Sequence, residues 1–259
     1  MAGGVVLVQG ASRGLRLHFC KHILATRQEA KVIATCRKPA AASALQALCE
    51  LYPGNLTLLR LDATREAEIQ EAAEVVAEEP GHLDLLINSG AMLHPSARGE
   101  TCLQEVSAEG LSITLATNTL GPLVMAKYFA PLLRKGTGAF GHQFADQAKQ
   151  HRAVLVNLTA KVGSIGDKAL GGWYSYRMSK AALNMATKNL SIELGRGKTK
   201  VVCDSLHPGT GNTDLSKPYL RNVPKNKLFT PDYSINCLMN IIETLDMEKS
   251  GNHGSTLLG

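Results

Sequence analysis

Short apolar runs and amphipathic stretches alternate along the whole chain. Six runs rich in aliphatic and β-branched residues predict strands at 5–8, 31–36, 56–61, 83–88, 153–158 and 201–206. The segments between them have helical periodicity; Ile69, Ala72, Ala73 and Val76, for example, recur at i, i+3, i+4 and i+7. This alternation predicts an α/β fold with a doubly wound parallel sheet that helices cover on both faces. Ligands of such sheets bind beyond the carboxyl ends of the strands.

The composition agrees with one folded unit. Of the 259 residues, 44% are hydrophobic and 19% are charged, which suits a single large core, and no linker or repeat interrupts residues 1–134. The net charge of +6 is spread out, and only 5% of the residues are aromatic, so we do not expect a nucleic-acid partner. The basic excess would suit an anionic dinucleotide.

The cysteines and the first residues of the sequence indicate a reducing compartment. Six cysteines, at positions 20, 36, 49, 102, 203 and 237, lie far apart, without a Cys-x-x-Cys pair or a histidine at ligand spacing. We therefore expect reduced thiols and no metal site. No signal-peptide pattern opens the sequence, and no apolar run approaches the ~18 residues of a membrane span. The expected location is cytoplasmic, without a membrane partner.

The first predicted strand ends in a glycine turn. Residues 5–16 read Val-Val-Leu-Val-Gln-Gly-Ala-Ser-Arg-Gly-Leu-Arg, and a helical pattern begins after Gly14. The backbone N–H groups and the dipole at a helix N-terminus suit a pyrophosphate. Gly10 and Gly14 would let the backbone approach a phosphate more closely than any residue with a Cβ.

A tyrosine and a lysine lie one helical turn apart further along the chain. Tyr176 and Lys180 share one face of a predicted helix. A free phenol has a pKa of about 10 and is a poor acid or base at neutral pH. A nearby ammonium group lowers that pKa toward the range in which proton transfer is efficient. The same spacing also occurs by chance on amphipathic helices, so the glycine turn upstream is needed to favour catalysis.

Taken together, these motifs resemble the short-chain dehydrogenase/reductases, and within them the C-factor-like and sniffer-like carbonyl reductase branch. The resemblance covers about residues 4–251. It rests on Gly10-Ala-Ser-Arg-Gly14, Leu61-Asp62, Asp84-Leu-Leu-Ile-Asn88, Asn118, Tyr176 with Lys180, and Leu206-His-Pro-Gly209 with Thr213. It implies a single NAD(P)-binding domain of the Rossmann type over residues 1–259.

The resemblance also implies the roles of the site residues. Hydride would pass between nicotinamide and a carbonyl carbon, and Tyr176 would supply the proton to the oxygen. Lys180 would lower the tyrosine pKa and hold the nicotinamide ribose, and Asn118 would anchor a water that feeds the proton relay. The residues expected to bind the cofactor are Gly10, Ser12, Arg13, Gly14, Leu15, Arg37, Asp62, Asn88, Lys180, Pro208, Gly209 and Thr213.

Three positions depart from the family pattern. Arg16 replaces the third glycine of the turn, so its side chain must splay outward or push the helix away from the strand. Asn88-Ser-Gly-Ala91 keeps small residues after the fourth strand but reorders them. Where the family has two serines at the end of the fifth strand, this chain has Thr159-Ala160, so the hydroxyl that polarises a carbonyl is missing. Thr159 and Ser164 are the available substitutes, and we place Ser164 with Asn118, Tyr176 and Lys180 among the candidate catalytic residues.

The end of the second strand favours NADP(H) over NAD(H). Family members that prefer NAD have an acidic residue there to hold the ribose hydroxyls. In this chain the strand ends Cys36-Arg37-Lys38. Arg37 and Arg13 could instead hold a 2′-phosphate through charge-assisted hydrogen bonds.

Three segments fall outside the regular alternation. Residues 135–152 are typical of a surface loop, either a tolerated insertion or a partner site. Residues 214–230 correspond to the family's substrate lid, where Tyr219, Leu220 and Phe229 could contact substrate or anchor the loop to the core. Residues 252–259 lack the aromatic strand of the branch. We expect an irregular tail there, a seventh strand that is missing or frayed, an unpaired sheet edge and a weakened homodimer.

The sequence therefore predicts an NADP-dependent oxidoreductase that acts on a small carbonyl or hydroxyl compound. One alternative is a dinucleotide-binding protein of the same fold without catalysis, which Arg16 and Ala160 would favour. Another is a truncated, inactive isoform, which the tail would favour.

Overall fold

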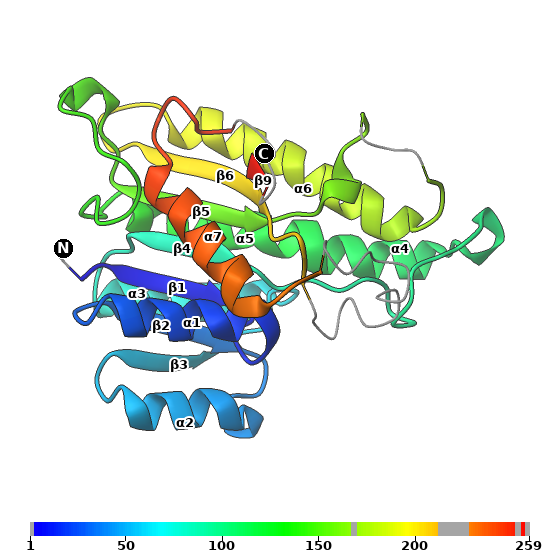
Figure 1. The fold of residues 1–259 in the computed structure, drawn as a ribbon, viewed down its shortest axis with the longest axis horizontal. Helices are drawn as coiled ribbons and strands as arrows, with labels where there is room; N and C mark the ends of the chain where they lie inside the picture. Colours follow the sequence, from blue (N-terminus) through cyan, green and yellow to red (C-terminus); the bar gives the residue numbers. More distant parts are fainter. Residues whose placement is uncertain (1–2, 167–169, 212–227, 252–254, 257–259) are drawn as a thin grey trace.

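A parallel β-sheet forms the centre of the molecule (Figure 1). This computed structural model describes residues 3–166, 170–211, 228–251 and 255–256. The strands of the sheet are β1 (Val5–Gln9), β2 (Lys31–Cys36), β3 (Leu56–Arg60), β4 (Leu85–Asn88), β5 (Ala153–Leu158), β6 (Val201–His207) and β9 (Ser255–Thr256), in the order β3-β2-β1-β4-β5-β6-β9. The six predicted parallel strands are confirmed. Every residue of β1, β4 and β5 is buried, as expected of strands that helices cover on both sides.

Helices form a layer on each face of the sheet. One core contains side chains of α1 (Gly14–Thr26), α2 (Ser43–Leu51) and α7 (Pro231–Thr244). The opposite core contains side chains of α3 (Glu66–Glu78), α5 (Gly121–Leu133) and α6 (Tyr174–Leu194), and α4 (Ala108–Leu115) packs against α6. The predicted apolar stripe of α3 is buried in full. The shorter elements are η1 (Pro39–Ala41), η2 (Leu103–Glu105), the π-helix η3 (Ala116–Leu120), η4 (Gln147–Lys149), η5 (Lys161–Gly163), β7 (Thr210–Gly211) and β8 (Leu228–Phe229).

The seventh strand of the sheet is present but short. Ser255 and Thr256 pair in parallel with Leu206 and His207 at the end of β6. The chain before them is already tied to β6, because the Gly251 N–H donates to the Cys203 carbonyl at 2.8 Å. The edge that the sequence was expected to leave unpaired is therefore partly covered, although by a strand of only two residues. Residues 252–254 and 257–259 lie outside the described part of the chain.

The segment 135–152 is irregular but not confined to the surface. Phe140 is fully buried in the core beside α1 and α7, with the Arg27 guanidinium 4.1 Å from its ring centroid. His151 is 4% exposed, and its Nε2 lies 2.9 Å from the Phe140 carbonyl oxygen. Gly138 and Gly141 adopt left-handed backbone angles on either side of Phe140. The glycines thus allow a tight turn that inserts one aromatic anchor into the core.

Most of the expected substrate lid, with Tyr219 and Leu220, lies outside the described residues. Phe229, in β8, stacks on Tyr233 of α7 with ring centroids 5.3 Å apart. This contact favours an anchoring role for Phe229. Among the described helices, none combines the length and the apolar character needed to cross a membrane.

Candidate active site

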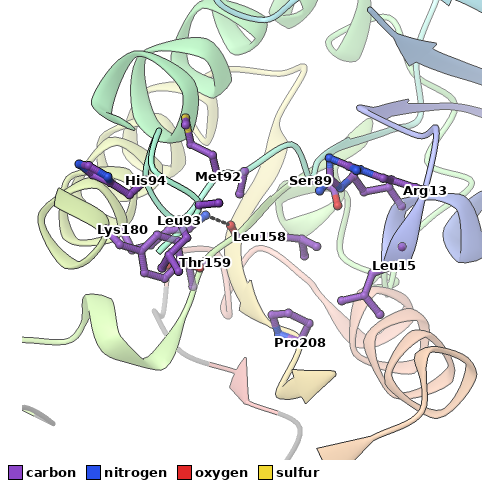
Figure 2. Close-up of a pocket in the computed structure, with 15 residues that line it drawn as sticks. Arg13, Leu15, Ser89, Met92, Leu93, His94, Leu158, Thr159, Lys180 and Pro208 are labelled. Atoms are coloured by element: carbon purple, nitrogen blue, oxygen red, sulfur yellow. Dashed lines mark hydrogen bonds between the residues drawn. The ribbon is translucent and has the colours of Figure 1, made fainter. Parts of the chain in front are cut away.

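A cavity lies where the strand order of the sheet reverses, between β1 and β4. Parallel sheets bind their ligands beyond the carboxyl ends of the strands at this point. The cavity has a volume of about 280 Å³. Its lining residues lie at or just after the carboxyl ends of β1, β4, β5 and β6, in the first turn of α1 or in α6: Arg13, Gly14, Leu15, Arg16, Ser89, Ala91, Met92, Leu93, His94, Ala97, Leu158, Thr159, Tyr176, Lys180 and Pro208. Figure 2 shows Arg13, Leu15 and Ser89 on one side of it and His94, Lys180 and Thr159 on the other.

The turn between β1 and α1 depends on its glycines and leaves the start of α1 without an acidic residue. Gly10 and Gly14 have φ angles of 78° and 60°, in the left-handed region that favours glycine. No acidic residue lies in the first turn of α1, and the Arg13 side chain does not cap the helix. A Cβ on Gly10 would lie 3.3 Å from the Gly90 Cα, and one on Gly90 would lie 2.5 Å from the Gln9 amide. These close approaches explain why glycine occurs both at position 10 in the turn and at position 90 in the loop opposite it.

Arg16 turns back toward the glycine turn. Its Nη1 lies 3.5 Å from the Gly10 carbonyl oxygen, and its side chain lines the cavity. The family's third glycine position is therefore occupied by a cation that faces the ligand space. This outcome differs from both expected alternatives, in which the side chain would splay outward or would displace the helix.

Tyr176 and Lys180 lie together in the wall of the cavity. They are 7% and 2% exposed, and the Lys180 Nζ lies 5.8 Å from the centroid of the Tyr176 ring. The ammonium group also donates to the Leu158 carbonyl at 2.8 Å (Figure 2). Burial, and then the nearby Arg16 guanidinium, lower the pKa of Lys180 to about 7. Burial, with smaller effects of Lys161 and Lys180, lowers the pKa of the neighbouring His207 to about 4.

Asn118 connects the loop after β4 to α6, the helix of Tyr176 and Lys180. It lies in the π-helix between α4 and α5 and is fully buried. Its Nδ2 donates to the Met92 carbonyl at 2.8 Å and to the Ser179 hydroxyl at 3.0 Å. The Ser179 hydroxyl in turn donates to the Tyr176 carbonyl at 2.8 Å. Both donors of the amide are thus committed to protein groups, which leaves only its oxygen for the expected water, and that oxygen already accepts from the Met92 N–H.

The structure separates the two candidate substitutes for the missing serine. Thr159 is buried at the end of β5 and lines the cavity, and its hydroxyl donates to the Asn184 Oδ1 at 2.6 Å. Ser164 is exposed, follows η5 and does not line the cavity. The preceding Gly163 packs closely on α6, since a Cβ there would lie 2.8 Å from the Lys180 Cβ. Of the two residues, Thr159 therefore lines the same cavity as Tyr176, and Ser164 does not.

A second hollow, of about 530 Å³, lies beside the ends of β2 and β3. Three residues expected to bind the cofactor lie there, Ser12, Arg37 and Asp62. The parallel register pairs Cys36 with Arg60 and so brings Arg60 close to Arg37. The charged residues of the hollow are four cations and two carboxylates, namely Arg37, Lys38, Arg60, Arg65, Asp62 and Glu68. Its positive balance suits an anionic group.

The other expected cofactor residues fall into three groups. Pro208 lines the cavity, and Gly209 follows it with a φ of 69°. Asn88 is buried, and its amide donates to the Asn157 Oδ1 at 2.9 Å, so it joins the ends of β4 and β5 and does not line the cavity. Thr213 lies outside the described residues. The sequence interpretation missed the segment 91–97 as a cavity wall, although its position just after a predicted strand was a usable signal.

Comparisons with known proteins identify the family. The family model for short chain dehydrogenases matches residues 4–223. A carbonyl reductase from chicken fatty liver, solved with NADPH, is 31% identical, with a TM-score of 0.84 and coverage of 100% of this chain and 98% of that chain. The carbonyl reductase Sniffer of D. melanogaster is 27% identical, with the same TM-score and coverage. An uncharacterized oxidoreductase of Schizosaccharomyces pombe is 30% identical, over 96% of this chain and 93% of its own length.

The chain thus has the fold of the NADPH-bound carbonyl reductase, and it belongs to the short-chain dehydrogenase family. It is an NAD(P)-dependent oxidoreductase, as the resemblance implied. The non-catalytic protein and the inactive isoform are not favoured, because the family members it matches are reductases and oxidoreductases.

Proposed function

We propose that this chain reduces a small carbonyl compound of partly apolar character and that it uses NADPH in preference to NADH. The observation that carries the proposal is the burial of Tyr176 and Lys180 side by side in the wall of a cavity at the carboxyl ends of the strands. Apolar side chains of Leu15, Met92 and Leu93 line the same cavity. The expected cytoplasmic location and weakened homodimer stay predictions from the sequence.

The residues present fit the dinucleotide. The uncapped N-terminus of α1 and the close glycine contacts would receive the pyrophosphate, with Arg13 and Arg16 beside it. The hollow with Ser12 and Arg37 would receive the adenosine end and its 2′-phosphate. When bound, the nicotinamide supplies the hydride that reduces the carbonyl carbon.

The chain's own residues would manage the proton. Tyr176 donates the proton of its hydroxyl to the carbonyl oxygen, and the Lys180 ammonium stabilises the phenolate that remains. Thr159 lines the same cavity, but its hydroxyl donates its proton to Asn184 and so does not donate to the substrate oxygen. Asn118 and Ser179 hold the backbone of Tyr176 against the loop after β4. The site therefore offers a proton donor and a rigid support for it.

Arg37→Ala should weaken NADPH binding and leave NADH binding nearly unchanged. One lost hydrogen bond between charged groups costs about 1.5–3 kcal/mol, and here it would affect only the cofactor that carries a 2′-phosphate. Titrations followed by nicotinamide fluorescence measure both affinities. NADH serves as the internal control. Equal affinities of the wild-type chain for the two cofactors, or tighter binding of NADH, would refute the assignment.

Ala160→Ser should raise the rate of carbonyl reduction about 10-fold or more, because it restores a hydroxyl donor at the position where the family has one. The gain is expected since the Thr159 hydroxyl already donates to Asn184. The measurement is kcat for NADPH-dependent reduction. Ser164→Ala is the matched control and should change kcat little, as Ser164 does not line the cavity. Loss of activity in Ser164→Ala would instead identify Ser164 as the missing hydroxyl.

A further inference from the structure

A buried carboxylate lies at the start of the helix that carries Tyr176. Glu100 belongs to the loop between β4 and α4, and its side chain is 1% exposed. The Glu100 Oε1 accepts a hydrogen bond from the Ser175 backbone N–H at 3.1 Å and another from the Ser175 hydroxyl. Ser175 is the second residue of α6 and the immediate neighbour of Tyr176. The Glu100 carboxylate therefore binds the residue that directly precedes Tyr176, the proposed proton donor.

Glu100 provides the cap that the residue before α6 does not provide. That residue, Trp173, has a left-handed backbone with a φ of 54°, and its side chain does not cap the helix. The first N–H groups of a helix need an acceptor, and a carboxylate there also interacts favourably with the helix dipole. Glu100 supplies the acceptor and the negative charge from 75 residues away in the sequence.

The loop around Glu100 packs closely against the start of α6. The Trp173 N–H donates to the Glu100 carbonyl at 2.6 Å. A Cβ on Gly99 would lie 2.5 Å from the Trp173 Cδ1, and one on Gly172 would lie 2.9 Å from the Glu100 carbonyl oxygen. The Trp173 ring meets the Tyr176 ring edge to face, with centroids 6.2 Å apart. A shift of Glu100 would reach Tyr176 through Trp173 as well as through Ser175.

His94 connects this cap to the cavity. It lines the cavity, and its Nε2 lies 4.0 Å from the Glu100 Oε1. Among the described residues, the His94 Nε2 and the Glu100 Oε2 are buried without a hydrogen-bond partner. Burial acts to raise the pKa of Glu100, but the hydrogen bonds from Ser175, with a smaller effect of His94, bring this pKa below its ordinary value. Glu100 is therefore a carboxylate at neutral pH.

We propose that Glu100 is a positioning residue of the active site, which caps α6 and thereby holds Tyr176 at the cavity wall. The kinetic consequence rests on the proposed function, in which Tyr176 is the proton donor. The cap itself does not depend on activity, so the cap and the proposed function can be refuted separately.

Trp173 allows the cap to be tested without turnover, because it is the chain's only tryptophan. Glu100→Ala should shift its fluorescence to longer wavelength and increase its quenching by acrylamide. Glu100→Gln should retain the wild-type spectrum, since an amide oxygen can still accept from Ser175. Glu109→Gln is the matched control: this carboxylate is exposed in the first turn of α4, and its loss should leave Trp173 unchanged.

Kinetics distinguish positioning from general stability. Glu100→Ala should lower kcat about 10- to 100-fold, in line with the cost of a small misplacement of a catalytic group. The dissociation constant of NADPH should stay within about twofold, because no contact of the glycine turn changes. The pH profile of kcat should move to higher pH as Tyr176 moves away from Lys180, and Glu100→Gln should restore most of kcat.

The outcomes separate the two proposals. Unchanged Trp173 emission in Glu100→Ala overturns the cap, whether or not the wild-type chain reduces carbonyls. An equal loss of kcat and NADPH affinity in Glu100→Ala and Glu100→Gln indicates a general structural role and also overturns it. A shifted Trp173 spectrum in a chain that turns over no carbonyl supports the cap and contradicts the proposed function. If Glu100→Ala does not fold, Glu100→Asp takes its place, because the shorter side chain draws the carboxylate back from both Ser175 donors; a shifted spectrum supports the cap and an unchanged one refutes it.

Discussion

Tyr176→Phe is expected to abolish carbonyl reduction while NADPH still binds. The substitution removes only the phenol hydroxyl, and the ring stays buried in its edge-to-face contact with Trp173. The loss of a general acid lowers a rate by about 10²- to 10⁴-fold. The rate is measured as kcat for reduction of a carbonyl substrate, and NADPH binding is followed by nicotinamide fluorescence.

A second tyrosine of the same helix provides the control. Tyr174, the first residue of α6, does not line the cavity. Tyr174→Phe should therefore leave kcat within about twofold of the wild-type value. Turnover that survives in Tyr176→Phe at the wild-type rate would remove Tyr176 from the mechanism.

Lys180→Met should abolish activity nearly as completely and should also remove a pH dependence of cofactor binding. The pKa of Lys180 falls from 10.5 to about 7, first because of burial and then because of Arg16. In the free protein the ammonium form is therefore populated below about pH 7 and the neutral amine above it. An anionic dinucleotide favours the ammonium form of Lys180. Above pH 7, cofactor binding is therefore coupled to the uptake of a proton by Lys180. Affinity should be greatest below pH 7 and should fall by at most about tenfold per unit above it.

The affinity for NADPH, measured across the range of about pH 6 to pH 9, tests this linkage. His207, with its pKa of about 4, does not titrate in this window. Lys188→Met is the control from the same helix, because Lys188 donates to the Gly251 carbonyl at 3.2 Å, away from the cavity. It should keep the pH dependence of the wild type. A wild-type affinity that is constant or rises with pH would contradict the assigned role of Lys180.

The strands of the sheet could be predicted because their signal is local. A buried parallel strand needs an unbroken apolar run, and β2 and β5 have the predicted bounds to the residue. The glycine turn was equally readable, since the left-handed backbone at Gly10 and Gly14 leaves few alternatives to glycine. The spacing of Tyr176 and Lys180 predicted their shared helix face, and the structure places them together.

Features that depend on distant packing could not be predicted. The sequence offered Thr159 and Ser164 as equal substitutes for the missing serine, and only the tertiary fold places Thr159 in the cavity wall and leaves Ser164 exposed. The two-residue strand β9 pairs with the end of β6, and Gly251 just before it donates to Cys203 of the same strand. The cap by Glu100 joins segments 75 residues apart, and no capping motif precedes Tyr176 to suggest it. In each case a tertiary contact determines what the local pattern leaves open.

The most direct test of the proposed function is the oxidation of NADPH by the wild-type chain in the presence of aldehydes, ketones and quinones. The proposal predicts that NADPH absorbance falls in step with the formation of the alcohol or hydroquinone, faster than with NADH. It also predicts that the reaction is lost in Tyr176→Phe. NADPH that binds tightly but is oxidised by none of these compounds would contradict it.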